Sequence, residues 1–207
     1  MSSAGVRRGK GWSGVFLMAA LAIAAPPAGA HLVQTGLGGF ADGAARLVLT
    51  PSDLLLVCGL SALAVQQGAA CAVRLRLALP LSWLLGGIVG LQLPFELSTP
   101  WLNTIAFSLV GLLVALEVPM GRRATMALTV LVGLWFGLIN GSALAFHSGA
   151  ALALVGGVVG VTAMTTMLTL ALTPPHPAWL RIGLRVAGSW MAASGLLMLG
   201  WLIKYSS

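Results

Sequence analysis

Charged residues are scarce in this chain and absent from long stretches of it. Asp, Glu, Lys and Arg make up only 7% of the 207 residues, and Arg123 and Arg181 enclose 57 residues that contain none of these four types. A helix of about 20 apolar residues crosses a bilayer, so this run is long enough for two crossings and a turn. Because backbone in lipid must satisfy its own hydrogen bonds, a helix is the simplest structure for each crossing.

Shorter uncharged runs repeat this pattern along the rest of the chain. They contain 18 to 20 residues each and cover 54–73, 77–95, 97–116 and 186–203. With 58% apolar residues and a mean hydropathy of +1.00, the runs predict an all-α polytopic membrane protein and exclude the soluble classes. The sequence has no Ser-His-Asp pattern, phosphate-binding loop or paired carboxylates at catalytic spacing, so we expect no catalytic residues and no enzyme activity.

The cysteines argue against a disulfide-rich or zinc-binding protein, and the basic residues argue against a nucleic-acid-binding protein. The two cysteines, Cys58 and Cys71, lack CxxC spacing, which disfavours a disulfide framework or a zinc site. The net charge is +7, but Lys and Arg occur in short clusters between the apolar runs. Such clusters carry topology information rather than forming a basic face, so we expect no nucleic-acid partner.

The first 30 residues have the pattern of a secretory signal peptide. A basic region over residues 7–10 precedes an apolar stretch over 12–25, two prolines and the small residues that end at Ala30. This order predicts cleavage after Ala30, which leaves His31 as the mature N-terminus. The alternative is an uncleaved anchor helix, which would raise the number of spans from six to seven.

The distribution of arginine predicts the topology, because cytoplasmic loops of membrane proteins are enriched in Lys and Arg. Residues 31–52 are then a periplasmic segment, and residues 53–207 form a bundle of six transmembrane helices in a bacterial inner membrane. We expect the spans at about 53–72, 77–95, 100–118, 124–142, 150–172 and 183–203. Arg46 and Lys204 are the two basic residues that this topology leaves outside.

Small residues spaced by one helical turn predict how the helices pack. They occur as Gly86-x-x-x-Gly90, Gly156-x-x-x-Gly160 and Gly188-x-x-x-Ala192. Such faces let helix backbones approach closely in a bilayer. We therefore expect a compact bundle in contact with lipid.

A few polar residues in or near the spans are candidates for a site. Asp53 opens the first span, and Glu117 lies near the inner end of the third, where we expect an ion pair with Arg122 or Arg123. His31 and His147 both fall on the outer side. The amine and imidazole of a mature His31 would chelate Cu(II) or Ni(II), with Asp53 as an oxygen ligand. The alternative is unrelated polar residues at the water interface.

The chain resembles the HupE/UreJ family of small membrane proteins, which are linked to hydrogenase and urease gene clusters and regarded as nickel permeases or accessory proteins. The resemblance includes a signal peptide that ends at Ala30-His31 and the element Gly39-Phe40-x-x-Gly43. It continues through the Leu/Ala/Gly-rich residues 105–116 and Phe136-Gly137-Leu138-Ile139.

The family's characteristic histidines are mostly replaced in this chain. Where the resemblance implies His-Pro-x-x-Gly-x-Asp-His, the chain has Arg46, Leu47, Thr50, Ser52 and Asp53. Where it implies His-Gly-His-Ala-His, the chain has Asn140-Gly141-Ser142-Ala143-Leu144. The histidine at position 31 is retained, and His147 is a candidate substitute. Asn and Ser are poor ligands for nickel, copper and zinc, so we expect a reduced metal affinity.

Two hypotheses for the function follow. The first is transition-metal handling, or assistance to a metalloenzyme, with a nickel or copper ion bound at a reduced periplasmic site formed by His31, Asp53, Asn140 and His147. The second is a non-transporting structural subunit that packs against other membrane subunits of a larger complex. Lost ligands and retained glycine faces favour the second.

Overall fold

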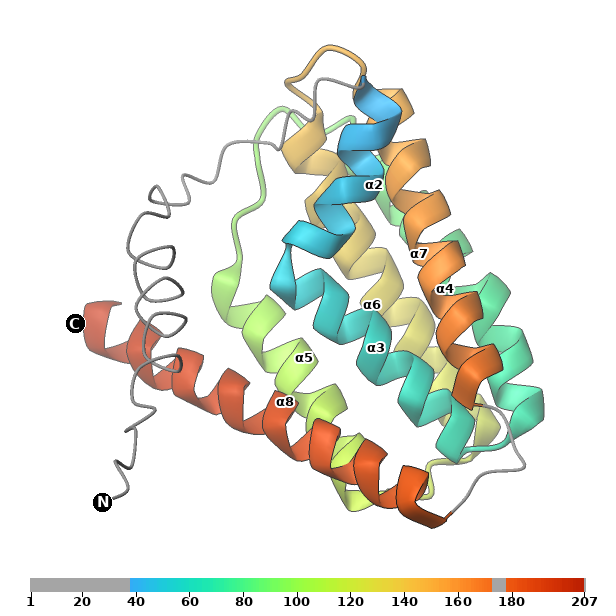
Figure 1. The fold of residues 1–207 in the computed structure, drawn as a ribbon. Coiled ribbons are helices and arrows are strands. Elements are labelled where there is room, and N and C mark those ends of the chain that lie inside the picture. Colours follow the sequence, from blue (N-terminus) through green and yellow to red (C-terminus); the bar gives the residue numbers. More distant parts are fainter. Residues whose placement is uncertain (1–37, 173–177, 207) are drawn as a thin grey trace, which may run out of the picture. The chain divides into compact units, whose positions relative to one another are not determined.

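The computed structural model describes residues 38–172 and 178–206. Within these ranges all regular elements are helices, labelled as in Figure 1. The predicted signal peptide and His31 lie outside the described residues. The helices are α2 (Gly39–Leu49), α3 (Pro51–Gln66), α4 (Ala69–Gly90), α5 (Pro100–Leu116), α6 (Gly121–Leu144), α7 (Ala150–Leu172) and α8 (Ala178–Ser206).

Four of these helices are long and apolar enough to cross a membrane, namely α4, α6, α7 and the Trp179–Lys204 part of α8. The pair α2 and α3 passes the same test when taken together, although the two helices are bent by 73° at the break between them. The apolar helix α5 is shorter. The chain is therefore an all-α, multi-pass membrane protein. A count of six spans stays a prediction, in which α5 and the bent pair provide two of the six.

The first two predicted spans differ from the helices in that region. α3 ends at Gln66 and α4 begins at Ala69, whereas the charge pattern predicted spans over 53–72 and 77–95. Gly68 between them has a φ of 107°, a conformation that glycine adopts without steric cost. The chain therefore turns before the arginines, and Arg74 and Arg76 lie inside the first turns of α4.

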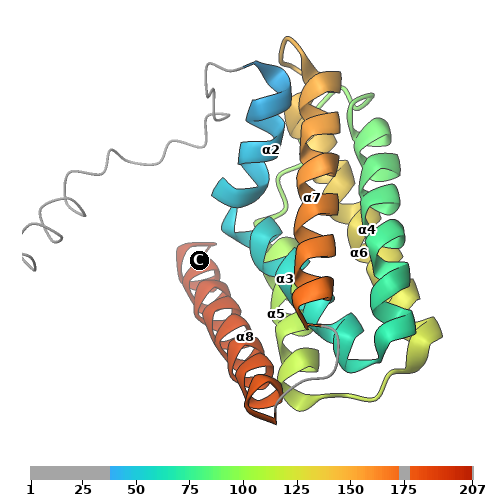
Figure 2. The ribbon, with the colours of Figure 1, turned by 45° about the vertical axis from the view of Figure 1, so that its right-hand side comes forward.

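A short helix also lies within the segment that we expected to be a periplasmic extension. α2 packs along α7 (Figure 2), and its eleven residues are too few to be recognised as a span by hydropathy. Pro51 at the first position of α3 starts the second half of the bent pair. The side chain of Thr50 makes no capping hydrogen bond.

α3 is the central helix of the fold. It packs against α2, α4, α5, α6, α7 and α8. Ten of its sixteen residues are buried, so no side of the helix forms a continuous polar face. This pattern is typical of a helix that other helices surround.

Glycines on both helices bring the backbones of α4 and α6 into close contact. A Cβ atom added at Gly86 or Gly90 of α4 would collide with backbone oxygens of α6, at Leu134 and Leu138. In the reverse direction, a Cβ atom at Gly137 or Gly141 of α6 would collide with backbone oxygens of α4, at Trp83 and Gly87. The packing predicted for Gly86-x-x-x-Gly90 is confirmed, and its partner is a second glycine row on α6.

The other two predicted small-residue faces also pack against helices. A Cβ atom at Gly156 of α7 would collide with the backbone oxygen of Phe40 on α2. A Cβ atom at Gly188 of α8 would lie 2.7 Å from the backbone nitrogen of Ala115 and the backbone oxygen of Gly111 on α5. Three close helix pairs, α4–α6, α2–α7 and α5–α8, therefore surround α3.

These contacts also fix the helix directions. Gly86 faces Leu134 and Gly90 faces Leu138, so residue numbers increase in the same direction along both helices. α4 and α6 therefore run parallel. α5 and α8 run antiparallel, because Gly111 faces Ala192 while Ala115 faces Gly188. The starts of α4, α6 and α8 lie at one end of the bundle, which we call the arginine end after Arg74, Arg122, Arg123, Arg181 and Arg185.

We predict that Gly137→Ala lowers the stability of the protein. The added methyl group would overlap the backbone of α4, and overpacking of this kind costs about 1–3 kcal/mol. The matched control is Gly200→Ala in α8, where a Cβ atom meets nothing within 4 Å and helix propensity favours alanine. Thermal unfolding in detergent measures both variants. Equal melting temperatures would contradict the close α4–α6 contact.

Candidate functional site

Three polar side chains from different helices meet at the break between α2 and α3. The Asn140 side chain on α6 donates from Nδ2 to Oδ2 of Asp53 on α3, at 2.8 Å. Arg46 on α2 donates from Nε to Oδ1 of Asn140, at 3.0 Å. Asn140 thus joins a cation to an anion, and we call this set the Arg46–Asn140–Asp53 bridge.

Burial makes the bridge important for the fold. Asp53 is 4% exposed and Asn140 is 8% exposed, whereas Arg46 is half-buried. Asn140 Nδ2 also donates to the backbone oxygen of Phe136, at 3.0 Å, and Ser52 donates to Asp53 Oδ1, at 3.3 Å. A buried charge is costly unless it is paired and hydrogen-bonded, so each member of the bridge depends on the others.

The bridge lies in the half of the bundle away from the arginine end. Leu47 contacts the position of Gly160, which is near the middle of α7. Asn140 is adjacent to Gly141, which faces Gly87, and Gly87 in turn faces Leu154 in the first half of α7. A broken helix with polar groups near mid-depth is the arrangement in which many transporters bind their substrates.

The surroundings of the bridge add one further charge. Glu96, in the connection between α4 and α5, attracts Arg46 electrostatically. That connection is tied to α6 because the backbone nitrogen of Leu97 donates to Oγ of Ser142, at 3.0 Å. The connection between α4 and α5 is therefore held next to the end of α6 that carries Asn140.

The predicted site residues are brought together only in part. Asp53 and Asn140 are hydrogen-bonded partners. His147 is exposed in the connection between α6 and α7 and makes no side-chain hydrogen bond to either of them. His31 lies outside the described residues. In the part of the chain that the structure describes, no group of three or more His, Cys, Asp or Glu side chains could hold a metal ion.

Arg46 is the member of the bridge that the sequence analysis did not select. The available signal was its position, because it is one of two basic residues that the charge pattern left on the outer side. A basic residue that breaks the topology rule inside a membrane protein is a reason to look for a buried partner. Its guanidinium supplies the positive charge of the bridge.

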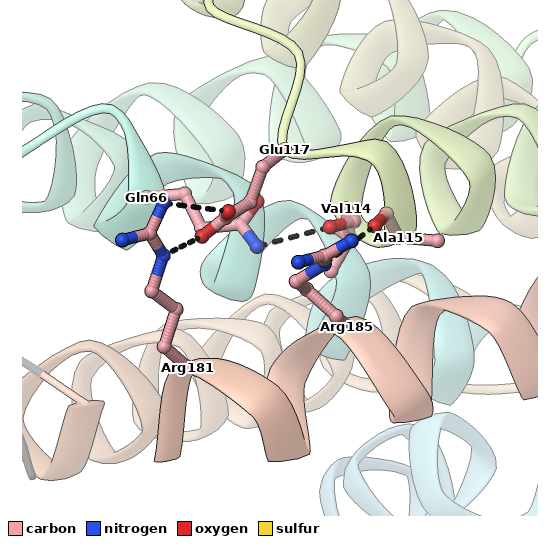
Figure 3. A network of polar contacts seen from close by, with 6 residues as sticks. All are labelled: Gln66, Val114, Ala115, Glu117, Arg181 and Arg185. Carbon is pink, nitrogen blue, oxygen red and sulfur yellow. Dashed lines mark hydrogen bonds and ion pairs between the residues drawn. The ribbon is translucent and has the colours of Figure 1, made fainter. Parts of the chain in front are cut away.

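A second polar network joins α3, α5 and α8 at the arginine end (Figure 3). Arg181 binds both oxygens of Glu117, at 2.6 and 2.8 Å. Arg185 Nε donates to the backbone oxygen of Ala115, and Gln66 Nε2 donates to that of Val114. The expectation that Glu117 pairs with Arg122 or Arg123 is wrong, because α8 returns to the end of α5 and brings Arg181 within reach.

Glu117 combines an ion pair with an unusual backbone conformation. It follows the last residue of α5 with a φ of 50°, in the left-handed region that is uncommon for residues other than glycine. The hydrogen bonds from Arg181 hold the pKa of the Glu117 carboxyl below its usual range. The ionised form is therefore favoured in the folded protein.

Comparison with known proteins now identifies the family. The model of the family described as HupE / UreJ protein matches residues 19–198, which is most of the chain. The chain belongs to the HupE/UreJ family. Neither the curated proteins nor the solved structures include a match. Family membership indicates an accessory membrane protein concerned with a metal.

The structure of this HupE/UreJ protein brings together three of the five positions at which the two motifs of the resemblance imply histidine. Arg46, Asp53 and Asn140 stand where the resemblance implies histidines, and all three meet in the bridge. Positions far apart in the sequence therefore converge at one centre. In this chain the centre contains one cation, one anion and one amide in place of three imidazoles.

We predict that Asn140→Ala strongly destabilises the protein. The substitution removes the amide that donates to Asp53 and accepts from Arg46, and a hydrogen bond to a charged group contributes about 1.5–3 kcal/mol. The control is Asn103→Ala, since Asn103 accepts one bond from Trp135 Nε1 at 3.3 Å and should cost about 1 kcal/mol. Unfolding in detergent measures both losses, and equal losses would refute the coupling of the bridge.

We also predict that the stabilising effect of Glu117 depends on pH. Because its pKa is lowered on folding, the ion pair stabilises the protein above the unfolded-state pKa of about 4.3. That contribution is lost as the pH falls through the lower folded-state pKa. The difference in melting temperature between wild type and Glu117→Gln should therefore shrink towards zero on acidification. A constant difference from pH 7 downwards would contradict this.

Proposed function

We propose that this HupE/UreJ protein handles a transition-metal ion, nickel or copper, in a bacterial inner membrane. The ion would contact the chain at the break between α2 and α3, with Asp53 and Asn140 as oxygen ligands. His31 and His147 would add nitrogen ligands from the periplasmic side. The mature N-terminus is then periplasmic, and the site is reached from the end of the bundle opposite the arginine end.

The buried carboxylate of Asp53 is the observation that carries this proposal. It is 4% exposed and lies beside a helix break, where backbone groups leave the regular hydrogen-bond ladder. Ionisable groups inside membrane proteins are costly, and they commonly mark ion pathways. The convergence of three positions at which the resemblance implies histidines supports the same location.

The ligand chemistry predicts weak binding. Nickel and copper favour imidazole nitrogen, and the bridge offers a carboxylate and an amide oxygen. Arg46 donates to the same Asn140 oxygen that a metal would need, so a cation must displace the guanidinium. Weak and exchangeable binding suits conduction, because an ion that binds too tightly is not released.

A second candidate function is a non-transporting subunit of a larger membrane complex. One observation favours it, namely that Arg46 already neutralises Asp53 through Asn140. In this case the bridge is a structural joint that replaced a metal site. The glycine contacts between helices are then the part of the family design that this chain retains.

Metal uptake by cells that express the protein distinguishes the two functions. On the transport proposal, Asp53→Asn should reduce nickel or copper uptake by at least about tenfold, the scale expected when a group that supports metal binding is removed. The asparagine keeps the size and the hydrogen bond of the aspartate while it removes the charge. Glu117→Gln is the control, because Glu117 pairs with Arg181 at the arginine end, away from the bridge, and should leave uptake nearly unchanged.

The reverse substitution tests the second candidate. Arg46→His combined with Asn140→His returns imidazoles to the bridge and removes the competing cation. If wild type neither binds nor imports metal while this double variant binds nickel in calorimetry, the chain is a subunit whose site was replaced. Uptake by wild type that Asp53→Asn leaves unaltered would refute the proposed site.

A further inference from the structure

A large apolar cavity lies apart from the bridge, on the other side of α3. Its volume is about 670 Å³, and α3, α5, α7 and α8 all contribute to its lining. The lining is nearly all apolar or small, as shown by Leu55, Ala62, Leu168, Gly183 and Ala187. It exists because α8 packs mainly on α5 and only slightly on α3.

The cavity opens towards the surrounding bilayer. Trp190 of α8 lines it and is 76% exposed, and Val186, one turn earlier, is also exposed. An apolar opening that faces lipid carries no layer of hydration water. A soluble ligand that bound there would therefore gain nothing from the release of water. The occupant that such an opening meets first is therefore a hydrocarbon chain of the membrane.

The depth of the cavity distinguishes a lipid chain from a helix of another protein. On α8 the lining extends from Gly183 to Ser194, which corresponds to about 16 Å of helix. This is about half of the 30 Å hydrocarbon core. The α7 residues that line it, Leu168 and Leu172, belong to the last turns of that helix. The cavity is thus confined to one leaflet, whereas a spanning helix needs a groove of full depth.

The charge at this end of the protein selects the kind of lipid. The arginine end has exposed basic side chains at Arg74, Arg122, Arg123, Arg181 and Arg185. Glu117 is the one acidic residue of the chain at this end, and Arg181 already binds it. Clusters of basic residues next to a membrane attract anionic lipids.

We propose that the cavity holds an acyl chain of an anionic phospholipid that comes from the leaflet at the arginine end. The chain of the lipid fills the space between α3 and α8, and the headgroup lies in the positive potential of the arginines. The lipid then completes the packing of α8, which contacts among the residues that the structure describes leave open on this side. The proposal is independent of metal handling, because the bridge contacts α6 on the opposite side of α3.

Two glycines of α8 provide a matched test. A Cβ atom at Gly183 or at Gly200 meets no atom within 4 Å, so both accept a larger side chain without a backbone clash. Gly183 lines the cavity and Gly200 does not. Wild type, Gly183→Trp and Gly200→Trp are reconstituted into nanodiscs of equal phosphatidylglycerol and phosphatidylcholine, and the released proteins are examined by native mass spectrometry.

We expect wild type and Gly200→Trp each to retain one phosphatidylglycerol, and Gly183→Trp to lose most of it. Ala187→Leu, a smaller change in the same lining, should lower retention if Gly183→Trp does not fold. Equal lipid retention by all variants, or a lipid-free dimer of this chain, would overturn the proposal. Equal retention of phosphatidylcholine would overturn the choice of an anionic headgroup, as would a headgroup preference unaffected by raising the salt from about 0.1 M to about 1 M.

Discussion

The structure depends on the close approach of helix backbones at glycine. Within lipid there is no hydrophobic driving force between apolar helices, so association relies on contact area and short-range attraction. The three glycine-mediated pairs provide this contact, and they enclose α3 on most of its circumference. Because the parallel pair α4–α6 leaves no room for a methyl group between its backbones, α6 is fixed in both rotation and height. The position of Asn140 next to α3 is a consequence of that fixed packing.

α3 begins in the middle of the bundle, and it can do so because the helices around it are tightly packed. A chain that breaks its helix at mid-depth leaves polar groups that lipid cannot satisfy. Here the break is enclosed by α6 and α7, the backbone nitrogens of Thr50 and Leu54 bond to the backbone oxygens of Arg46 and Thr50, and the bridge pairs the charged side chains beside the break. The same enclosure excludes water, which strengthens the attraction between Arg46 and Asp53. The 73° bend and the buried ion set therefore stabilise each other, and neither is expected in isolation.

The sequence predicted the helical class well and the site less completely. Uncharged runs revealed the long helices, and α7 has the predicted bounds of 150–172. Hydropathy did not reveal α2, because a half-length helix has too few apolar residues to stand out. The resemblance pointed to positions 46, 53 and 140, but Arg46 and Asn140, which are hydrogen-bonded, are 94 positions apart in the sequence. Contacts between residues so far apart in the sequence depend on how the helices pack, and local sequence patterns do not predict that packing. Arg181 was missed as the partner of Glu117 for the same reason.

The side of α3 that faces α6 carries a charged residue, and the side that faces α8 is apolar. The two sides of the helix are therefore suited to different ligands. Towards α6 it carries Asp53 within an ion set whose total charge is zero, so a cation that displaced Arg46 would leave the guanidinium in need of another acid. Glu96 is the acid that already attracts Arg46, and it stands on the connection between α4 and α5 that is tied to Ser142. Towards α8 the same helix presents only apolar and small residues. The bridge therefore lies on the α6 side of α3, while the α8 side is suited to hydrocarbon. α3 keeps the two environments apart.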